Sequence, residues 1–231
     1  MWESDAECGG CLEAKRALFS DKASVRELPI DLKAGTVQIS ERLRVPLEPM
    51  IGTIATASVD ENAASTFMPT YKNGGNMDLR QLGKGASIVL PVLAEGGLLY
   101  VGDLHAAMGH GEPTWVGFES AGTVVMRVSL VKGKQFPYPR LYIGDRTLFT
   151  SVCARHPIGA DQPNIQYMSN IPHDTATQDA LSQAYDYLVE DEGLTPEEAH
   201  GFLTAKADAF FGGPASAQAI ISLPDVKKYL I

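Results

Sequence analysis

The sequence predicts an α+β fold with a β-rich, sandwich- or barrel-like core and a C-terminal helical hairpin packed on that core. From Asp78 to Ser151, short apolar runs alternate with glycine-containing turns, a spacing typical of antiparallel sandwiches and barrels. From Asp174 onward, apolar residues recur at helical spacing, and an apolar run over Ala217–Ser222 then indicates a last strand. Because a helix must bury one face against another element, we expect the hairpin to cover the sheet.

The composition is that of a globular protein and excludes several partner classes. The chain has 231 residues, of which 45% are hydrophobic and 20% charged, enough for a sizeable core. Its formal net charge is −9 without a basic cluster, which argues against nucleic acid and anionic membranes as partners. Apolar runs stay shorter than the ~18–20 residues of a membrane helix, and the first residues lack the order of a signal peptide. We therefore expect a cytoplasmic protein.

Residues 1–28 differ from the rest of the chain and are expected to form an irregular N-terminal segment, followed by one domain over residues 29–231. The segment has little apolar periodicity beyond a short predicted helix over Leu12–Phe19. Cys8 and Cys11 form a CGGC motif, which is found in redox pairs and in half zinc sites. Because no second CxxC motif follows, free thiols are the favoured interpretation.

The first half of the domain is predicted to contain three strands and a long loop. Thr36–Ser40 and Leu43–Leu47 alternate apolar and polar residues, and Met50–Ser58 is a small apolar run typical of a buried strand. Val59–Asn73 is polar and contains proline, which indicates a surface loop. The glycines in Asn73–Asn76 predict a tight turn with positive backbone φ.

Further strands are predicted up to residue 152 from apolar runs bounded by turn residues. They cover Ser87–Leu93, Leu98–Val101, Trp115–Phe118, Thr123–Leu130, Leu141–Ile143 and Thr147–Val152.

Two helices follow these strands. The first is predicted over Asp174–Glu192, with Gly193 as its stop. Thr195–Glu198 reads TPEE, which combines a threonine cap, a proline at the first helical position and a glutamate three residues after the cap. The second helix is expected to reach Gly212-Gly213, with Phe210 on its apolar face.

The stretch Gly102–Glu119 carries most of the residues suited to chemistry. Residues two apart on a strand face the same side, so Asp103 and His105 can direct a carboxylate and an imidazole at one ion. The alternative is that Asp103 caps a turn and His105 is a core histidine. Glu119 follows an apolar run, where an unpaired carboxylate is costly to bury. A histidine with carboxylates in apolar surroundings fits zinc or a similar divalent ion.

The remaining polar residues carry weaker signals. His110 lies between two glycines and is expected to be a flexible loop residue near solvent. Asn76 and Asp78 are two apart beside Gly-Gly, and a turn that caps the next element explains them equally well. Cys153 and His156 could act as nucleophile and base, but a single cysteine after a strand is more often buried core.

Several motifs in order resemble the acetamidase/formamidase family. They are GGNMDLRQL (Gly74–Leu82), LPV (Leu90–Val92), GDLHAAMGHGE (Gly102–Glu112) and Glu119. VPLEPMIGTI (Val45–Ile54) and LVEDEGLTPEEA (Leu188–Ala199) extend the resemblance on both sides, so that it covers the chain from about Pro29 to the end.

The resemblance implies a β-rich α+β fold and hydrolysis of small linear amides, such as formamide and acetamide, to a carboxylate and ammonia. It also implies a metal-dependent, cytoplasmic homo-oligomer, a dimer or a tetramer. Asp103 and His105 match the family's GDxHA motif, and Glu119 matches a later acidic position. We expect these three residues to hold a divalent ion, zinc being the expected one.

The same resemblance suggests catalytic roles for three more residues. Glu112 stands at the family's Gly-Glu and is expected to be the general base for water and then the acid for ammonia. Asn76 and Asp78 match GGNxD, with Asn76 as an oxyanion donor and Asp78 orienting a ligand or the substrate NH2 group. The division of roles between Glu112 and Glu119 is left open.

The chain departs from the family in two places, and two alternatives follow. The family usually reads GDGE where this chain has GHGE at Gly109–Glu112, and its members are longer at the N-terminus. The first alternative is a non-catalytic relative that serves as a binding or assembly module. The second is a metal-independent amidase that uses Cys153 as its nucleophile.

Overall fold

The computed structural model describes residues 2–3, 24–59, 70–113, 116–152, 173–212 and 218–231. The predicted helix over Leu12–Phe19, the pair Cys8 and Cys11, and Cys153 with His156 lie outside these residues. The irregular segment proposed for residues 1–28, and the domain boundary after it, therefore stay predictions.

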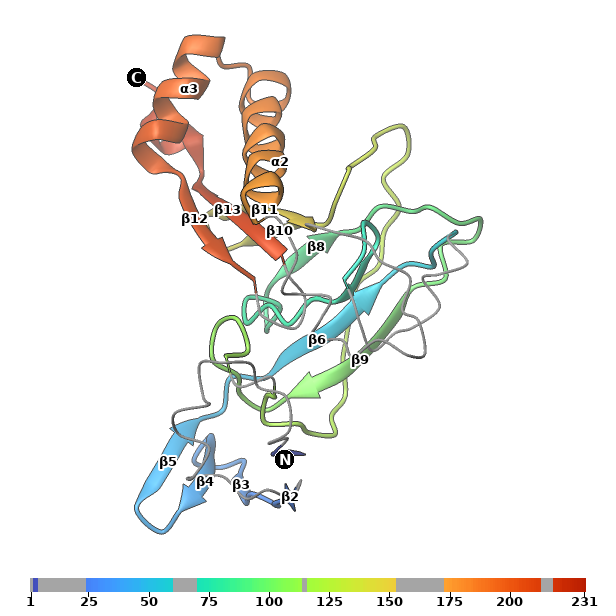
Figure 1. Cartoon of the computed structure of the whole chain (residues 1–231), viewed down its shortest axis with the longest axis vertical. Coiled ribbons are helices and arrows are strands. Elements are labelled where there is room, and N and C mark those ends of the chain that lie inside the picture. The colour runs from blue at the N-terminus through green and yellow to red at the C-terminus, as the bar shows by residue number, and fades with distance from the viewer. Residues whose placement is uncertain (1, 4–23, 60–69, 114–115, 153–172, 213–217) are drawn as a thin grey trace.

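A five-stranded antiparallel sheet forms the middle layer (Figure 1). In spatial order its strands are β12 (Asp208–Phe211), β13 (Gln218–Pro224), β11 (Arg146–Val152), β10 (Arg140–Ile143) and β8 (Ser87–Val89). Successive residues point to opposite faces, so Phe149 and Ile221 belong to one core cluster while Leu148 and Ile220 belong to another. The sheet is consequently covered on both sides.

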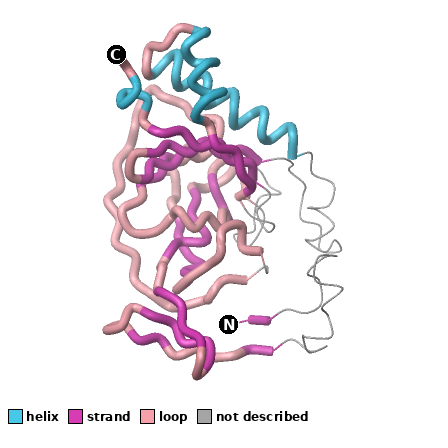
Figure 2. The backbone as a smooth tube through the Cα atoms, turned by 90° about the vertical axis from the view of Figure 1, so that its left-hand side faces the viewer, coloured by secondary structure: helices cyan, strands magenta, loops and turns pink. Residues whose placement is uncertain are grey.

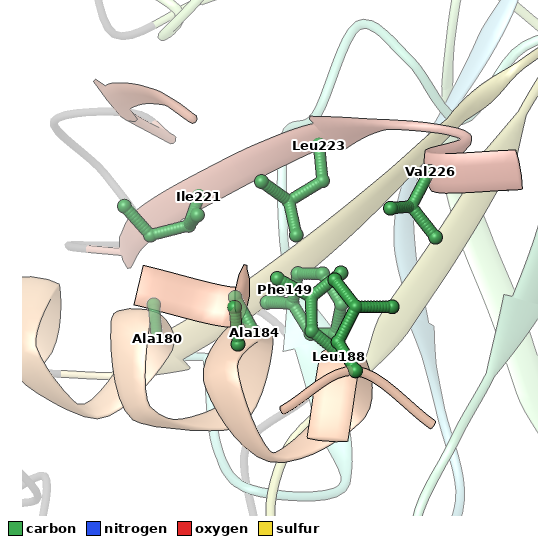
Figure 3. Packing of buried hydrophobic residues seen from close by; sticks show 9 residues of the cluster. Phe149, Ala180, Ala184, Leu188, Ile221, Leu223 and Val226 are labelled. Carbon is green, nitrogen blue, oxygen red and sulfur yellow. The ribbon is translucent and has the colours of Figure 1, made fainter. Parts of the chain in front are cut away.

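Helices cover one face of this sheet (Figure 2). Helix α2 (His173–Asp186) continues as a π-helical turn, η2 (Tyr187–Asp191), and α3 (Pro196–Lys206) follows after a short loop. Ala180 and Ala184 are fully buried, and their small side chains let α2 lie close to the sheet. Figure 3 shows Leu188 beside Phe149, with Ile221 and the rest of this cluster around them.

A second sheet packs against the other face. It has the order β7 (Gly74–Asn76), β6 (Met50–Ala55), β9 (Tyr100–His105), and all its neighbours are antiparallel. We call it the site sheet. The core between the two sheets is formed by buried residues from both sheets and from the irregular segment after β7, namely Ile54, Met77, Leu79, Leu82, Leu141, Leu148 and Ile220.

A third, smaller sheet lies at the end of the molecule away from the helices (Figure 1). It consists of β3 (Ile30–Asp31), β4 (Thr36–Ser40) and β5 (Leu43–Pro46). Two further short segments, β1 (Trp2–Glu3) and β2 (Ser24–Val25), pair with each other, and a 3-10 turn, η3 (Val226–Tyr229), follows β13. Within the described ranges, no helix is long and apolar enough to cross a membrane.

The predicted fold class is confirmed: the structure is mainly antiparallel sheet with C-terminal helices packed on it. Gly193 follows the first helix with a φ of 75°, and the TPEE signal begins the second. The second helix nevertheless ends at Lys206 instead of reaching Gly212-Gly213. Asp208–Phe211 pairs with β13 as an edge strand, so Phe210 faces the inter-sheet core instead of extending the helix.

The prediction of a strand over Thr123–Leu130 is wrong. Its residues form no helix or strand and are largely exposed, with Val125 at 93% and Val128 at 69%. Alternating apolar residues suit a strand, but a strand also needs a paired neighbour, and the described residues supply none there. Gly117 and Phe118 likewise form no strand. The chain meets β9 through an isolated bridge between Glu119 and His105, beside which the Ser120 N–H donates to Leu104 O.

Candidate metal and catalytic site

Strand β9 brings Asp103 and His105 to one place at the edge of the site sheet. His105 Nε2 lies 3.2 Å from Asp103 Oδ1. Glu119 pairs with His105 through an isolated antiparallel bridge, and its Oε2 is also 3.2 Å from His105 Nε2. The His105 side chain is 1% exposed, whereas those of Asp103 and Glu119 are 31% and 33% exposed. Two of the three residues predicted to hold an ion, Asp103 and Glu119, therefore flank the buried Nε2 of the third, His105.

Two glycines make this arrangement sterically accessible. A Cβ atom at Gly52 would lie 2.4 Å from Asp103 Oδ2, and one at Gly117 would lie 2.4 Å from His105 Nδ1. Both distances are far below van der Waals contact, so any larger residue would displace the side chain concerned. Gly117 also donates its backbone N–H to Glu119 Oε1, at 3.2 Å.

Asp78 and Glu112 form an inner group with the same histidine. Asp78 follows β7, while Glu112 ends the loop after β9, and they are 1% and 5% exposed. The ligand atoms of Asp78, His105 and Glu112 lie within 4.8 Å of one another, as do those of Asp103, His105 and Glu119. His105 thus belongs to two overlapping groups, an inner one and an outer one.

Neither carboxylate oxygen of Asp78 has a hydrogen-bond partner among the described residues. A buried carboxylate without a donor is expensive, because burial removes its hydration and nothing replaces it. Such a group fits a position where a cation or a shared proton supplies the missing interaction.

Thr53 connects Asn76 to the outer group. Its hydroxyl lies 2.9 Å from Asn76 Oδ1 and 3.2 Å from Asp103 Oδ2, and its one proton can serve only one of them at a time. Asn76 is 8% exposed and sits opposite Thr53 in the β6–β7 pairing. With Oδ1 accepting from Thr53, the Asn76 NH2 group is the part of this amide left to donate elsewhere.

The backbone is strained at the same residues. Among described non-glycine residues, positive φ occurs at Asp78 (46°), Asp103 (57°) and Glu112 (44°), and otherwise only at Leu98. Each such conformation costs on the order of 1–3 kcal/mol and persists only where the surrounding structure enforces it. Three of the four therefore coincide with candidate site carboxylates, and strain of this kind is often concentrated at functional sites.

The pKa values reflect the crowding of charge. Burial is the main reason that the pKa of Asp78 and that of Glu112 lie well above ordinary carboxyl values, and Asp103 and Asp78, respectively, add to these shifts. Burial alone would lower the pKa of His105, but Asp103 and Glu119 outweigh it and raise that pKa to about 10. Burial also opposes ionisation of Asp103, yet the hydrogen bond to His105 keeps its pKa below the usual value.

This donor set fits a divalent cation. One imidazole nitrogen with several carboxylate oxygens is a typical site for zinc and neighbouring metals, and a cation would compensate the partnerless oxygens of Asp78. Because a histidine ligand must be neutral, binding would release the proton that the carboxylates hold on His105.

The sequence predicted six residues for this site, and the structure gathers all six: Asn76, Asp78, Asp103, His105, Glu112 and Glu119. It adds Thr53, Gly52 and Gly117, which the sequence analysis missed. Gly117 interrupts an otherwise apolar run, a pattern that marks close approach of another group.

His110 does not join the site. As predicted, it lies in a loop and is partly exposed, but its ring contacts both Gln81 and the backbone of Phe211, which the sequence did not indicate.

Comparison with known proteins points to the same family as the sequence motifs. Residues 13–214 match the model of the Acetamidase/Formamidase family. An acetamidase of Mycolicibacterium smegmatis is 39% identical over 106 residues, which cover 41% of this chain and 26% of that protein. A formamidase of Methylophilus methylotrophus is 38% identical over 82 residues, covering 35% of this chain and 20% of that protein. The alignments thus span about a quarter or less of these relatives.

Solved structures agree over more of the chain. An acetamidase from Bacillus halodurans superposes with a TM-score of 0.77 at 28% identity, covering 99% of this chain and 69% of the other. A predicted acetamidase/formamidase from Thermoanaerobacter tengcongensis gives a TM-score of 0.72 at 28% identity, covering 87% of this chain and 62% of the other. Taken with the site geometry, the match over residues 13–214 shows that this chain belongs to the acetamidase/formamidase family.

Proposed function

We propose that this protein hydrolyses the carbon–nitrogen bond of small linear amides, of the formamide and acetamide kind, with a divalent ion, zinc. The observation that carries the proposal is the convergence of four carboxylates on the buried His105 in a chain of this family. A cytoplasmic homo-oligomer, a dimer or a tetramer, belongs to the same proposal.

Asp103, His105 and Glu119 would hold the ion. When bound, such an ion polarises the amide carbonyl and lowers the pKa of a coordinated water. The burial of His105 keeps the nitrogen ligand away from bulk water, while the partial exposure of Asp103 and Glu119 leaves a side open to a small substrate.

Glu112 would move the proton. A general base works best with a pKa near the working pH, and burial beside Asp78 raises the pKa of Glu112 in that direction. Glu112 takes a proton from the attacking water as the new carbon–oxygen bond forms. It returns that proton to nitrogen as the carbon–nitrogen bond breaks, which releases ammonia and the carboxylic acid, and the acid then loses its proton to become the carboxylate.

Asn76 and Asp78 would assist. The hydrogen bond from Thr53 to Asn76 Oδ1 fixes the amide orientation, so its NH2 group can donate to the developing oxyanion. Asp78 is 1% exposed, which suits a residue that tunes Glu112 better than one that touches the substrate.

The first experiment measures ammonia release from formamide and acetamide, with metal content determined on the same sample. Activity should disappear on chelation and return with zinc. Turnover that survives chelation but is lost to a thiol reagent would replace this proposal with the Cys153 mechanism. Bound metal without turnover on any short amide would favour the binding or assembly module.

The Glu112→Gln variant shows which of the two groups around His105 holds the ion. If Glu112 is the base, the variant should keep its metal and lose turnover by at least about 10²-fold, the lower end for general base catalysis. Loss of the metal in this variant would instead assign the ion to the inner group of Asp78, His105 and Glu112. Glu119→Gln is the matched control, and it should lose the metal because Glu119 is one of the three proposed ligands.

A further inference from the structure

His110 ties together three segments that the site depends on. Its Nε2 lies 2.9 Å from the backbone oxygen of Phe211 on β12, and its Nδ1 lies 3.3 Å from Gln81 Nε2. A carbonyl oxygen only accepts, so the ring proton sits on Nε2 and Nδ1 accepts from the Gln81 amide. The ring also packs edge-on against Phe210, with centroids 4.9 Å apart.

The residue occupies a tight turn that ends at Glu112. The backbone N–H of Glu112 donates to Gly109 O at 3.1 Å, which closes a four-residue turn with His110 in its second position. Gly111 takes the third position with a φ of 78°, as a type II turn requires. Because a turn of four residues has little freedom once closed, fixing the His110 ring also fixes the position of the Glu112 backbone.

The residues that His110 contacts are connected to the segment that carries Asp78, the neighbour of Glu112 in the inner group. Gln81 lies three residues after Asp78, and Met77 O accepts a hydrogen bond of 2.8 Å from Gln218 Nε2 on β13. The segment that carries Asp78 is therefore held by the five-stranded sheet, and His110 fastens the Glu112 turn to the same sheet and to the same segment. Both Asp78 and Glu112 have positive φ, so each needs such external support.

We propose that His110 is a positioning residue that sets the Asp78–Glu112 spacing by locking the Glu112 turn to Gln81 and to the backbone of Phe211. This inference rests on the proposed function: its kinetic readout needs turnover, whereas its cobalt readout needs only the proposed metal site. An aspartate at this position could not make the same tether, because a carboxylate cannot donate to the Phe211 carbonyl.

The test compares three substitutions in the full chain. His110→Leu keeps apolar bulk beside Phe210 without hydrogen bonds. His110→Asp introduces a carboxylate, which cannot donate, and His110→Gln retains an amide donor for the Phe211 carbonyl. His173→Leu is the matched control, since His173 packs on the Phe211 ring at 5.3 Å but lies outside the turn.

We expect His110→Leu and His110→Asp to lower kcat for formamide by about 10- to 100-fold with KM within about twofold, because small misplacements of catalytic groups act at that scale. His110→Gln should recover most of kcat, and His173→Leu should match the wild type. Equal kcat in all variants, or a loss in His110→Gln as large as that in His110→Leu, would overturn the proposal. If His110→Leu does not fold, the comparison of His110→Asp with His110→Gln decides in the same way.

Cobalt binding separates this inference from the proposed function. If the wild type releases no ammonia, Co²⁺ affinity and its visible absorption spectrum still report the geometry around His105 and Glu112. Because Glu112 lies beside the proposed ligands without being one of them, the tether predicts Co²⁺ affinity close to that of the wild type but an altered spectrum in His110→Leu, restored in His110→Gln. Identical spectra in wild type, His110→Leu and His110→Gln would contradict it.

Discussion

The helical hairpin and the site sheet lie on opposite faces of the same five-stranded sheet, and they are built differently. In the hairpin, local sequence and packing favour the same conformation. The Thr195 side chain accepts from the Glu198 backbone while the Glu198 side chain accepts from the Thr195 backbone, and Gly193 supplies the positive φ that ends the preceding helix. Ala180 and Ala184 are fully buried at the contact with the sheet.

The site sheet contains the exceptions to these rules. Three of its neighbouring carboxylate residues adopt positive φ, and Asp78 is buried without a hydrogen-bond donor among the described residues. Gly52 and Gly117 are needed only because Asp103 and His105 come too close for a Cβ. The difference teaches that destabilising features are concentrated where a ligand is expected, as in other proteins whose functional sites depart from local rules.

Glycine-to-alanine substitutions on the two sides should have opposite effects. Gly117→Ala would push the His105 ring away and should lower turnover by about 10²-fold, with a stability loss of about 1–3 kcal/mol from overpacking. Gly201 on α3 is exposed with open space around it, so Gly201→Ala should stabilise the protein by about 0.5–1 kcal/mol and leave turnover unchanged. Thermal unfolding measures the stability of each variant, and ammonia release measures its turnover. Equal changes in the two variants would contradict the difference described between the site sheet and the hairpin.

The stability of the metal-free protein should fall as pH rises. Folding raises the pKa of Asp78 from 3.8 to about 7 and that of Glu112 from 4.5 to about 8, so the folded state binds protons more tightly. The free energy of unfolding should therefore decline between about pH 4 and about pH 8, by at most a few kcal/mol. His105, with its pKa raised from 6.5 to about 10, continues this decline above pH 6.5.

Asp78→Asn should flatten the lower part of this profile, because the amide needs no proton to be neutral. Urea unfolding at a series of pH values measures the slope, and Glu41→Gln, at an exposed carboxylate, is the control that should leave it unchanged. A metal-free wild type whose stability is flat or rises from pH 4 to 8 would contradict the prediction.

A small effect, on stability alone, is expected at the helix cap of the hairpin. Thr195→Ala removes the capping box and should cost about 1 kcal/mol of stability. Because the cap lies on the helix-covered side, kcat and KM should stay at wild-type values. A loss of activity without loss of stability would mean that the hairpin influences the site.

Parts of this architecture could be predicted because their causes are local in the sequence. The TPEE cap and the Asp-x-His spacing on one strand depend on residues a few positions apart. Phe210 misled the helix prediction because its spacing also fits a helix, whereas pairing with β13 decided the outcome. The apolar alternation of Thr123–Leu130 could not reveal whether a partner strand exists.

The site was predicted as a set of residues but not as an arrangement. The meeting of Asp78 with Glu112, and the tether through His110, join segments that only the packing of two sheets brings together. The resemblance to a family supplied the residues without their spacing. The need for Gly52 and Gly117 follows from side-chain contacts across strands, which composition and periodicity do not encode.

Zinc-dependent thermal stability of the wild type and His105→Ala tests the central claim most directly. Both groups share His105, so zinc at about 100 times its dissociation constant should stabilise the wild type by about 2.7 kcal/mol and leave His105→Ala unchanged. A wild type that zinc does not stabilise, or equal stabilisation of both proteins, would contradict the account of this region as a metal site.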